Sequence, residues 1–278
     1  MTTTDEPIIT LDERSETARR PSNAPSLVAA AAMVVSCVAS SPSWAGDKGA
    51  APEVTQAFCD SIKHRYNAKH TRSVYRWKRK KHAAFIKYRT ENYGYFKGFG
   101  KPSWSSSTPK KNSERTTFFG IGVRLNKRII PALKCVERSI KAGCQDGKCT
   151  PKAEWPGECE LKHKRFPYKP RNLSGIRFRN TFRGGEVSNH VYGIAIDLDP
   201  TKNTCCKCVK RWRNHPLCKR KDLKHPWQRM IMPMCWVVHF ERYGFYWLGR
   251  DSLQDTIHFE FLGDPALVDR QVKRLRHR

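Results

Sequence analysis

Residues 188–198 read SNHVYGIAIDL, and this stretch decides the fold of the chain. After Gly193, which allows a sharp bend, aliphatic side chains alternate with small or acidic ones, as in a strand with one buried face. The buried side chains would be Ile194, Ile196 and Leu198. The other face carries Ala195 and Asp197, and the small alanine leaves room for an ion. The stretch therefore predicts a turn that presents His190 and a strand that presents Asp197.

A second stretch with the same period, TIHFEF at residues 256–261, predicts a second strand. Its apolar side chains are Ile257, Phe259 and Phe261, and its polar ones are Thr256, His258 and Glu260. If the two strands pair, Asp197 and His258 point to the same side of a sheet. Asp255 adds a carboxylate just before the strand. Two histidines and one aspartate, with a fourth position open to water, are typical of catalytic rather than structural zinc.

Two helices are expected where apolar periodicity runs from a proline to a glycine, at residues 131–142 and 233–243. A basic helix is expected from about residue 55 to residue 89, followed by a loop rich in Gly, Ser and Pro up to residue 110. Residues 143–170 contain three cysteines and are expected to form a loop that disulfides hold in place.

The charge balance is the unusual feature of the composition. The chain has 53 Lys and Arg against 25 Asp and Glu, a formal net charge of +28, while its 38% hydrophobic residues suffice for a packed fold. The positive excess is spread from about residue 62 to the C-terminus. Such a surface attracts polyanions, namely nucleic acid, anionic lipid or an acidic wall polymer, and charge alone does not choose among them.

The N-terminal part contains a short apolar segment, LVAAAAMVVSCVAS at residues 27–40. It is too short to span a membrane and suits the hydrophobic region of a secretory signal, with a small-residue cleavage site at Ala45. We therefore expect residues 1–45 to be a signal peptide and the mature chain to be exported, without a membrane span. Removal of three Arg and five acidic residues would raise the net charge from +28 to +30. The alternatives are a buried Ala-rich helix and lipid anchoring at Cys37.

Cysteine usage agrees with export. Besides Cys37 there are ten cysteines: Cys59, Cys135, Cys144, Cys149, Cys159, Cys205, Cys206, Cys208, Cys218 and Cys235. An even number in an exported chain predicts up to five disulfides, whose connectivity cannot be read from sequence. The alternative is a second zinc site at Cys205, Cys208, His215 and Cys218.

Two motifs carry a resemblance to a known family. They are Ser188-x-His190-x-x-Gly193-x-Ala195-x-Asp197 and, downstream, Asp255-x-x-His258-Phe259-Glu260. Together they resemble the D-alanyl-D-alanine carboxypeptidase family of zinc peptidases, which includes vancomycin-resistance peptidases, phage endopeptidases and extensin-like domains, within the superfamily of lysostaphin and the hedgehog domain. The aromatic stretch at residues 243–249 is similar to the one that precedes the family's second motif. The resemblance covers residues 166–263.

The resemblance implies an α+β fold in which a small antiparallel sheet, flanked by helices, carries one zinc ion. It implies His190, Asp197 and His258 as ligands and Asp255 as general base. An upstream arginine would bind the substrate. Arg179 is preferred because Arg177 and Arg179 alternate with Ile176 and Phe178 in a strand-like run, while Arg183 lies in a glycine-rich loop and is the alternative. Ser188 would touch the substrate or bond within its turn, and Glu260 would hydrogen-bond a ligand or an arginine.

The organisation that follows has four parts. These are a signal peptide (1–45), a basic, aromatic-rich N-terminal extension and linker (46–110), a zinc peptidase domain (111–265) and a basic tail (266–278). The expected function is cleavage of peptidoglycan stem peptides, either at a terminal D-Ala or within the peptide. The basic surface would bind an anionic wall or envelope polymer, and nucleic acid is not expected. The alternative is a non-catalytic basic module for anionic glycan or nucleic acid. His215, His225 and His239 are expected to have ordinary structural roles.

Overall fold

The computed structural model describes residues 54–70, 79–94, 111–144, 164, 166–178, 187–206, 208, 212 and 214–277. The expected signal peptide, Cys37, Cys149, Cys159 and both candidate substrate arginines, Arg179 and Arg183, lie outside these residues. No helix in the described part of the chain is both long and apolar enough to cross a membrane.

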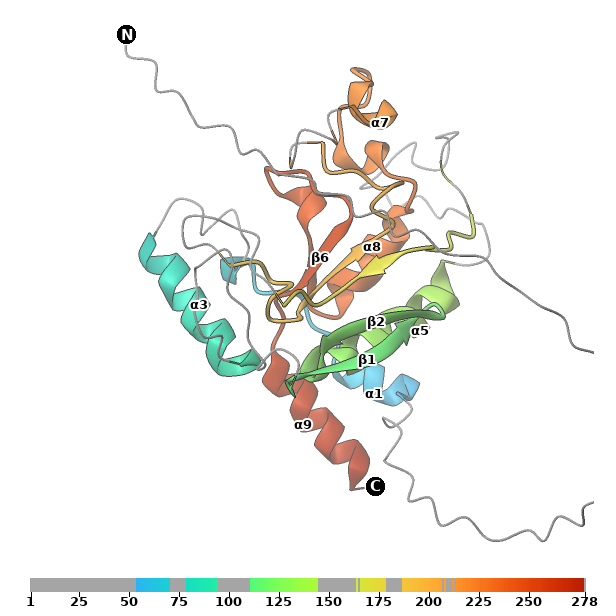
Figure 1. Ribbon diagram of the computed structural model, residues 1–278. Helices are drawn as coiled ribbons and strands as arrows, with labels where there is room; N and C mark the ends of the chain where they lie inside the picture. Colours follow the sequence, from blue (N-terminus) through green and yellow to red (C-terminus); the bar gives the residue numbers. More distant parts are fainter. Residues whose placement is uncertain are drawn as a thin grey trace, which may run out of the picture. The chain divides into compact units, whose positions relative to one another are not determined.

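The chain is of the α+β class, with helices and two small antiparallel sheets (Figure 1). The larger sheet has the order β3-β4-β6-β5 and consists of β3 (Leu173–Ser174), β4 (Ala195–Leu198), β6 (His258–Phe261) and β5 (Phe245–Trp247). The smaller one is a hairpin of β1 (Ser113–Phe118) and β2 (Ile121–Asn126). Both strands expected from sequence are present, and they pair with each other.

The helices are α1 (Gln56–Ser61), α3 (Arg79–Tyr93), α5 (Ile130–Gly143), α7 (Pro216–Lys219), α8 (Met234–Arg242) and α9 (Pro265–Arg276). Short 3-10 turns are η1 (Ala68–His70), η2 (Lys127–Ile129), η3 (Pro226–Arg229) and η4 (Leu248–Arg250). The helices expected at residues 131–142 and 233–243 are confirmed as α5 and α8. A proline begins each of them, as N-cap or in the first turn.

The continuous helix expected from residue 55 to 89 is wrong at residues 62–67, which are not helical. In this segment, backbone N–H groups donate hydrogen bonds to carbonyls that are distant in the sequence. The N–H of His64 donates to the carbonyl of Arg242 at 3.1 Å, and that of Asn67 to the carbonyl of Leu262 at 3.0 Å. These bonds satisfy groups that a helix would otherwise pair internally. Tertiary contacts therefore override the local helical preference.

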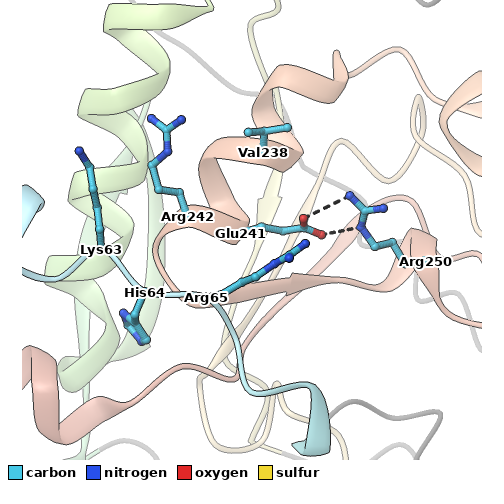
Figure 2. Close-up of a pocket in the computed structure, with 7 residues that line it drawn as sticks. All are labelled: Lys63, His64, Arg65, Val238, Glu241, Arg242 and Arg250. Carbon is cyan, nitrogen blue, oxygen red and sulfur yellow. Dashed lines mark hydrogen bonds and ion pairs between the residues drawn. The ribbon is translucent and has the colours of Figure 1, made fainter. Parts of the chain in front are cut away.

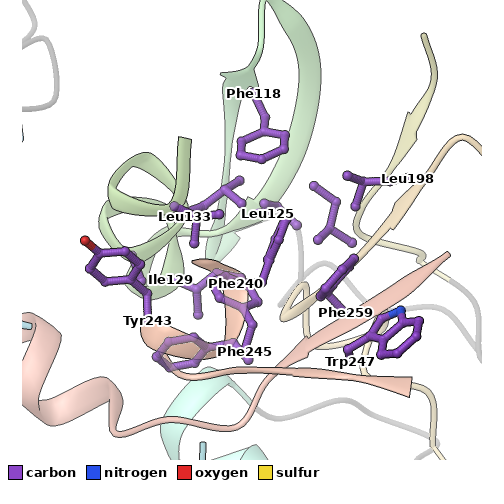
Figure 3. Close-up of a cluster of buried hydrophobic side chains, with 14 of the residues drawn as sticks. Phe118, Leu125, Ile129, Leu133, Leu198, Phe240, Tyr243, Phe245, Trp247 and Phe259 are labelled. Atoms are coloured by element: carbon purple, nitrogen blue, oxygen red, sulfur yellow. The ribbon is translucent and has the colours of Figure 1, made fainter. Parts of the chain in front are cut away.

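The core lies between one face of the four-stranded sheet and the helices α5 and α8 (Figure 3). Phe259 of β6 stacks on Phe240 of α8 with ring centroids 4.0 Å apart, and Phe245 of β5 meets Phe240 edge-on. The aliphatic face predicted for β4 is fully buried, as Ile194, Ile196 and Leu198 are each 0% exposed. Because side chains alternate along a strand, the opposite face of β4 and β6 is free to carry polar groups.

Four disulfides connect eight of the described cysteines. Cys59–Cys135 joins α1 to α5 and Cys144–Cys235 joins the end of α5 to α8, while Cys205–Cys208 and Cys206–Cys218 lie in the segment after β4. These two disulfides use sulfurs of the alternative zinc site, while Cys205, Cys208 and Asp255 also form a group whose ligand atoms lie close enough to hold a metal ion. His215 instead caps α7, where its Nδ1 accepts from the backbone N–H of Leu217.

The segments expected as extension and tail contribute to the core. Phe58 of α1 and Tyr93 of α3 belong to the main hydrophobic cluster, and so does Val268 of α9. Asp264 caps α9, and its side chain accepts from the backbone N–H of Ala266. Among the described residues, both ends of the chain therefore pack against the sheet and helices that carry the motifs.

Candidate metal centre

Three buried side chains from both motifs meet on the polar face of the four-stranded sheet. Nε2 of His190 lies 3.1 Å from Oδ1 of Asp197, and Nδ1 of His258 lies 2.8 Å from the same oxygen. The two ring nitrogens are 3.1 Å apart. All three residues are at most 7% exposed. The group, called the triad below, is able to hold a metal ion.

Strand register and one glycine position the triad. Asp197 of β4 stands directly opposite His258 of β6, so their side chains share a face. The turn before β4 brings His190 over the same face and ends at Gly193, whose φ is +70°. A Cβ there would lie 2.8 Å from the backbone nitrogen of Asn126. Glycine is therefore required for space as well as for the sharp bend that the sequence predicted.

Each histidine of the triad is oriented by a hydrogen bond through its other ring nitrogen. Nδ1 of His190 donates to the carbonyl of Gly175 at 2.6 Å, and Nε2 of His258 donates to Oε1 of Glu260 at 3.1 Å. Such partners fix the tautomer and turn the remaining nitrogen toward the metal position. Glu260 thus lies where the sequence placed it, beside a triad histidine.

Burial and charge set the protonation of the triad. Burial lowers the pKa of His190, so this ring is neutral. Burial also disfavours the charged form of His258, but hydrogen bonds to Asp197 and Glu260 outweigh it and raise the pKa of His258 to about 10. Although burial acts to raise the pKa of Asp197, the two histidines hold it well below its usual range. A metal ion must therefore displace the proton of His258.

The donor set of the triad fits zinc. Two imidazole nitrogens and one carboxylate oxygen are common zinc ligands, and oxygen-seeking Mg²⁺ and Ca²⁺ are poorly served by them. A tetrahedral zinc ion with bonds of about 2.0–2.1 Å needs ligands about 3.3–3.4 Å apart. The ligand atoms of the triad lie 2.8–3.1 Å apart, within a few tenths of an ångström of that spacing.

Arg177 is a contact of the triad to which the sequence analysis gave no role. Its guanidinium donates to Oδ2 of Asp197 at 2.9 Å, and its backbone N–H donates to the carbonyl of His190, also at 2.9 Å. The side chain is 39% exposed, so it reaches from solvent to the buried carboxylate. The signal was present in the sequence, because Arg177 and Arg179 alternate there with Ile176 and Phe178 in a strand-like pattern.

Asp255 lies beside the Cys205–Cys208 disulfide. Its Oδ2 is 3.5 Å from Sγ of Cys208, and its backbone N–H donates to the carbonyl of Leu248. Its carboxylate is not part of the triad, and within the described residues it belongs to a second group of potential metal ligands with Cys205 and Cys208. A base that acts on water rather than on the metal belongs outside the ligand set.

Ser188 and the other histidines have local structural partners. Oγ of Ser188 accepts from the backbone N–H of His190 at 3.3 Å, within the turn that carries this histidine. His239 of α8 bonds through Nδ1 to the hydroxyl of Ser139, and His225 caps η3. Neither histidine belongs to the triad.

Comparison with known proteins points to the same segment. Neither the search of curated proteins nor the search of solved structures gives a match. A sequence model for D-alanyl-D-alanine carboxypeptidase does match, over residues 182–261. These residues include the whole triad, Asp255 and Glu260. The segment that builds the candidate metal centre is thus similar to the D-alanyl-D-alanine carboxypeptidase family, as its two motifs indicated.

Proposed function

We propose that the chain is a zinc-dependent peptidase that hydrolyses peptidoglycan stem peptides. The observation that carries the proposal is the triad, three convergent ligand atoms on a sheet face within a segment that matches a carboxypeptidase family. The match itself supports a peptidase of the cell-wall carboxypeptidase kind. The metal and the substrate are the proposed part.

A zinc ion bound by His190, Asp197 and His258 would lower the pKa of a water molecule to about 7 and polarise the scissile carbonyl. Two neutral imidazoles and one carboxylate would leave a net positive charge there. Asp255 would accept the proton of the attacking water and return it to the leaving amine. Glu260 would keep the His258 ring in its tautomer through the hydrogen bond to Nε2.

Two arginines are assigned different roles, one at the metal ligand and one at the substrate. The guanidinium of Arg177 is engaged by Oδ2 of Asp197, so it holds this carboxylate in place. We assign the substrate carbonyl or carboxylate to Arg179, two residues further along the same run, with Arg183 as the alternative. A guanidinium suits either group because its N–H donors form a planar fork that stays charged.

The proposed setting is outside the cytoplasm. Four disulfides among the described cysteines are consistent with an exported protein. A net charge of +28 would hold the enzyme on an anionic wall or envelope polymer near its substrate. The reaction would be removal of a terminal D-Ala or cleavage within the stem peptide.

Metal analysis and hydrolysis of purified peptidoglycan, with and without chelator, test the proposal together. We expect one zinc ion per chain, with hydrolysis lost on chelation and restored by zinc. His190→Ala and His258→Ala should each lose both zinc and hydrolysis. His239→Ala is the matched control and should keep both, because its ring bonds to Ser139 outside the triad.

Two outcomes would contradict this assignment. Stoichiometric zinc in the His258→Ala protein would show that the third ligand is another residue. Zinc-loaded wild-type protein that leaves peptidoglycan intact would instead favour the alternative, a basic binding module of the same fold.

A further inference from the structure

A hollow of about 430 Å³ opens on the surface at residues that the proposed peptidase chemistry does not use (Figure 2). It is lined by Lys63, His64, Arg65, Val238, Glu241, Arg242 and Arg250. These residues come from three separate segments: the connection between α1 and η1, the last turns of α8, and η4. Its volume falls within the range of ligand sites, roughly 300–1,000 Å³.

The lining of this hollow is strongly cationic. Lys63, Arg65, Arg242 and Arg250 stand against a single carboxylate, that of Glu241. Arg250 neutralises Glu241 with two contacts, Nε to Oε1 at 2.7 Å and a terminal nitrogen to Oε2 at 3.2 Å. Among the lining residues, three positive charges therefore remain in excess of the carboxylate. A concave surface lined by one sign of charge concentrates ions of the opposite sign.

His64 fixes the position of the segment that joins α1 to η1, beside the hollow. Its Nδ1 donates to the carbonyl of Ile62 at 2.7 Å, and its Nε2 accepts from the backbone N–H of Asp264 at 2.8 Å. Both ring nitrogens are therefore occupied. A Cβ on Gly263 would lie 2.1 Å from Nε2 of this ring, so the backbone approaches closely here. The backbone N–H of His64 also donates to the carbonyl of Arg242 at 3.1 Å, so the connection and α8 are joined before any ligand arrives.

Two guanidinium groups in the hollow are available to a ligand. Within the described residues, the side chains of Arg65 and Arg242 have no hydrogen bond or ion pair, and both residues are exposed. Arg65 lies over the ring of Tyr66, 5.7 Å from its centroid, which limits where its side chain can go. Figure 2 shows Arg65 extending toward the wall formed by Glu241 and Arg250. Lys63 is paired with exposed Asp60, a contact that water screens.

We propose that this hollow binds a phosphate group. A phosphate carries about 1.5 to 2 negative charges at neutral pH and three acceptor oxygens, and guanidinium forks match its geometry. A carboxylate would neutralise only one of the three excess charges. The phosphate would come from a soluble phosphate or from a lipid headgroup. This inference does not depend on the proposed function, because the hollow and the triad share no residue.

The test is calorimetric titration of the full chain with inorganic phosphate at constant ionic strength, in the presence of a chelator. The chelator prevents phosphate from binding to a metal at the triad. The titration therefore measures binding at the hollow whether or not the peptidase proposal is correct. We expect saturable binding by the wild-type protein. Arg65→Gln with Arg242→Gln should weaken it at least about tenfold, because two charge-assisted contacts are lost.

The matched control removes the same charge elsewhere. Arg115 of β1 and Arg274 of α9 are exposed and lie outside the hollow. Arg115→Gln with Arg274→Gln should change phosphate affinity less than about twofold, since distant exposed charges are screened. Wild-type protein without saturable binding, or equal losses in both double variants, would overturn the proposal.

Sedimentation with vesicles separates the two sources of phosphate. The vesicles contain phosphatidylglycerol, with pure phosphatidylcholine as reference. If the hollow variant loses vesicle binding and the control variant keeps it, a lipid headgroup is the ligand. If the two variants bind vesicles equally and differ only in the phosphate titration, the ligand is a soluble phosphate.

Discussion

Asp255 lies three residues before His258 and is not a member of the triad, since its carboxylate is grouped instead with Cys205 and Cys208. If it is the general base, Asp255→Asn should keep zinc, because no ligand is lost. The rate kcat should fall by about 10²–10⁴, since an amide of nearly the same size cannot accept a proton. Zinc content, peptidoglycan hydrolysis and Tm of the variant check this, with Tm expected to change little.

Each other outcome for Asp255→Asn has a specific meaning. Loss of zinc would make Asp255 a ligand. Near-normal hydrolysis would move the base to another carboxylate, with Glu260 and Asp251 as the next candidates. Asp251 is 5% exposed, and its Oδ2 has no hydrogen-bond partner among the described residues.

Arg177 gives a second prediction at the residue scale. Arg177→Gln removes the contact to Oδ2 of Asp197 while it keeps a long polar side chain. Zinc affinity should fall by about 10–100-fold, the usual effect of losing a partner of a metal ligand. Arg171→Gln is the control, because Arg171 is exposed and lies outside the triad's contacts. Unchanged zinc affinity with a raised KM would instead make Arg177 a substrate-binding residue.

At the scale of elements, the predicted parts are those with a clear local period. Apolar and polar residues alternate along β4 and β6, so the two strands and the face they share could be predicted. A proline precedes or opens α5 and α8, and a glycine lies at the end of each, so residues such as Pro131 and Gly244 predicted the position of these helices. The shared face of Asp197 and His258 followed from the same alternation, whereas His190 was assigned from the turn before Gly193 and the family resemblance. A local pattern cannot predict a contact between residues that are distant in the sequence. Examples are the disulfide pairs and the hydrogen bond from the N–H of His64 to the carbonyl of Arg242, beyond the end of helix α1.

The β1–β2 hairpin was missed because its turn lacks the usual signal. Phe119 and Gly120 both have positive φ, +51° and +79°. Asn-Gly or Asp-Gly is the common pair at such positions, and a phenylalanine there is unusual. Helix α9 was not predicted from the sequence for a different reason. Its basic residues suggest a solvated tail, whereas Val268, Val272 and Leu275 recur on one helical face against the core.

Helix α3 supports the turn that carries His190, and this leads to a prediction. Arg89 of α3 is 3% exposed and donates to the carbonyl of Val187 at 3.1 Å and to the side chain of Asn189. Arg89→Met should lower the free energy of unfolding by about 1–3 kcal/mol for each buried acceptor that loses its donor. Because these acceptors flank His190, zinc affinity should fall as well.

Chemical denaturation and zinc titration measure the two effects of Arg89→Met separately. Lys87→Met on the same helix is the control, because Lys87 is exposed and forms a 3.8 Å surface pair with Glu91. It should change neither quantity appreciably. A folded Arg89→Met protein with wild-type zinc affinity would show that α3 stabilises the fold without positioning the turn.

At the scale of the whole molecule, the sheet separates two tasks. One face of β4 and β6 is packed against α5 and α8, and the other carries the triad. Disulfides hold the helices on the packed side. Cys59–Cys135 and Cys144–Cys235 span sequence separations of 76 and 91 residues, so each restricts a long loop of the unfolded chain. Such cross-links typically contribute about 2–5 kcal/mol, and they form in oxidising compartments.

The whole chain should therefore be exported and oxidised. Mass spectrometry of protein from the cell envelope or medium should find the first 45 residues removed, or about 36 if Cys37 is the lipid-anchored N-terminus. Alkylation before reduction should leave the eight paired cysteines unlabelled. Cys59→Ala with Cys135→Ala should lower the free energy of unfolding by about 2–5 kcal/mol, because α1 would no longer be tied to α5. A full-length cytoplasmic protein whose cysteines all react with the label would contradict both the expected compartment and the disulfides.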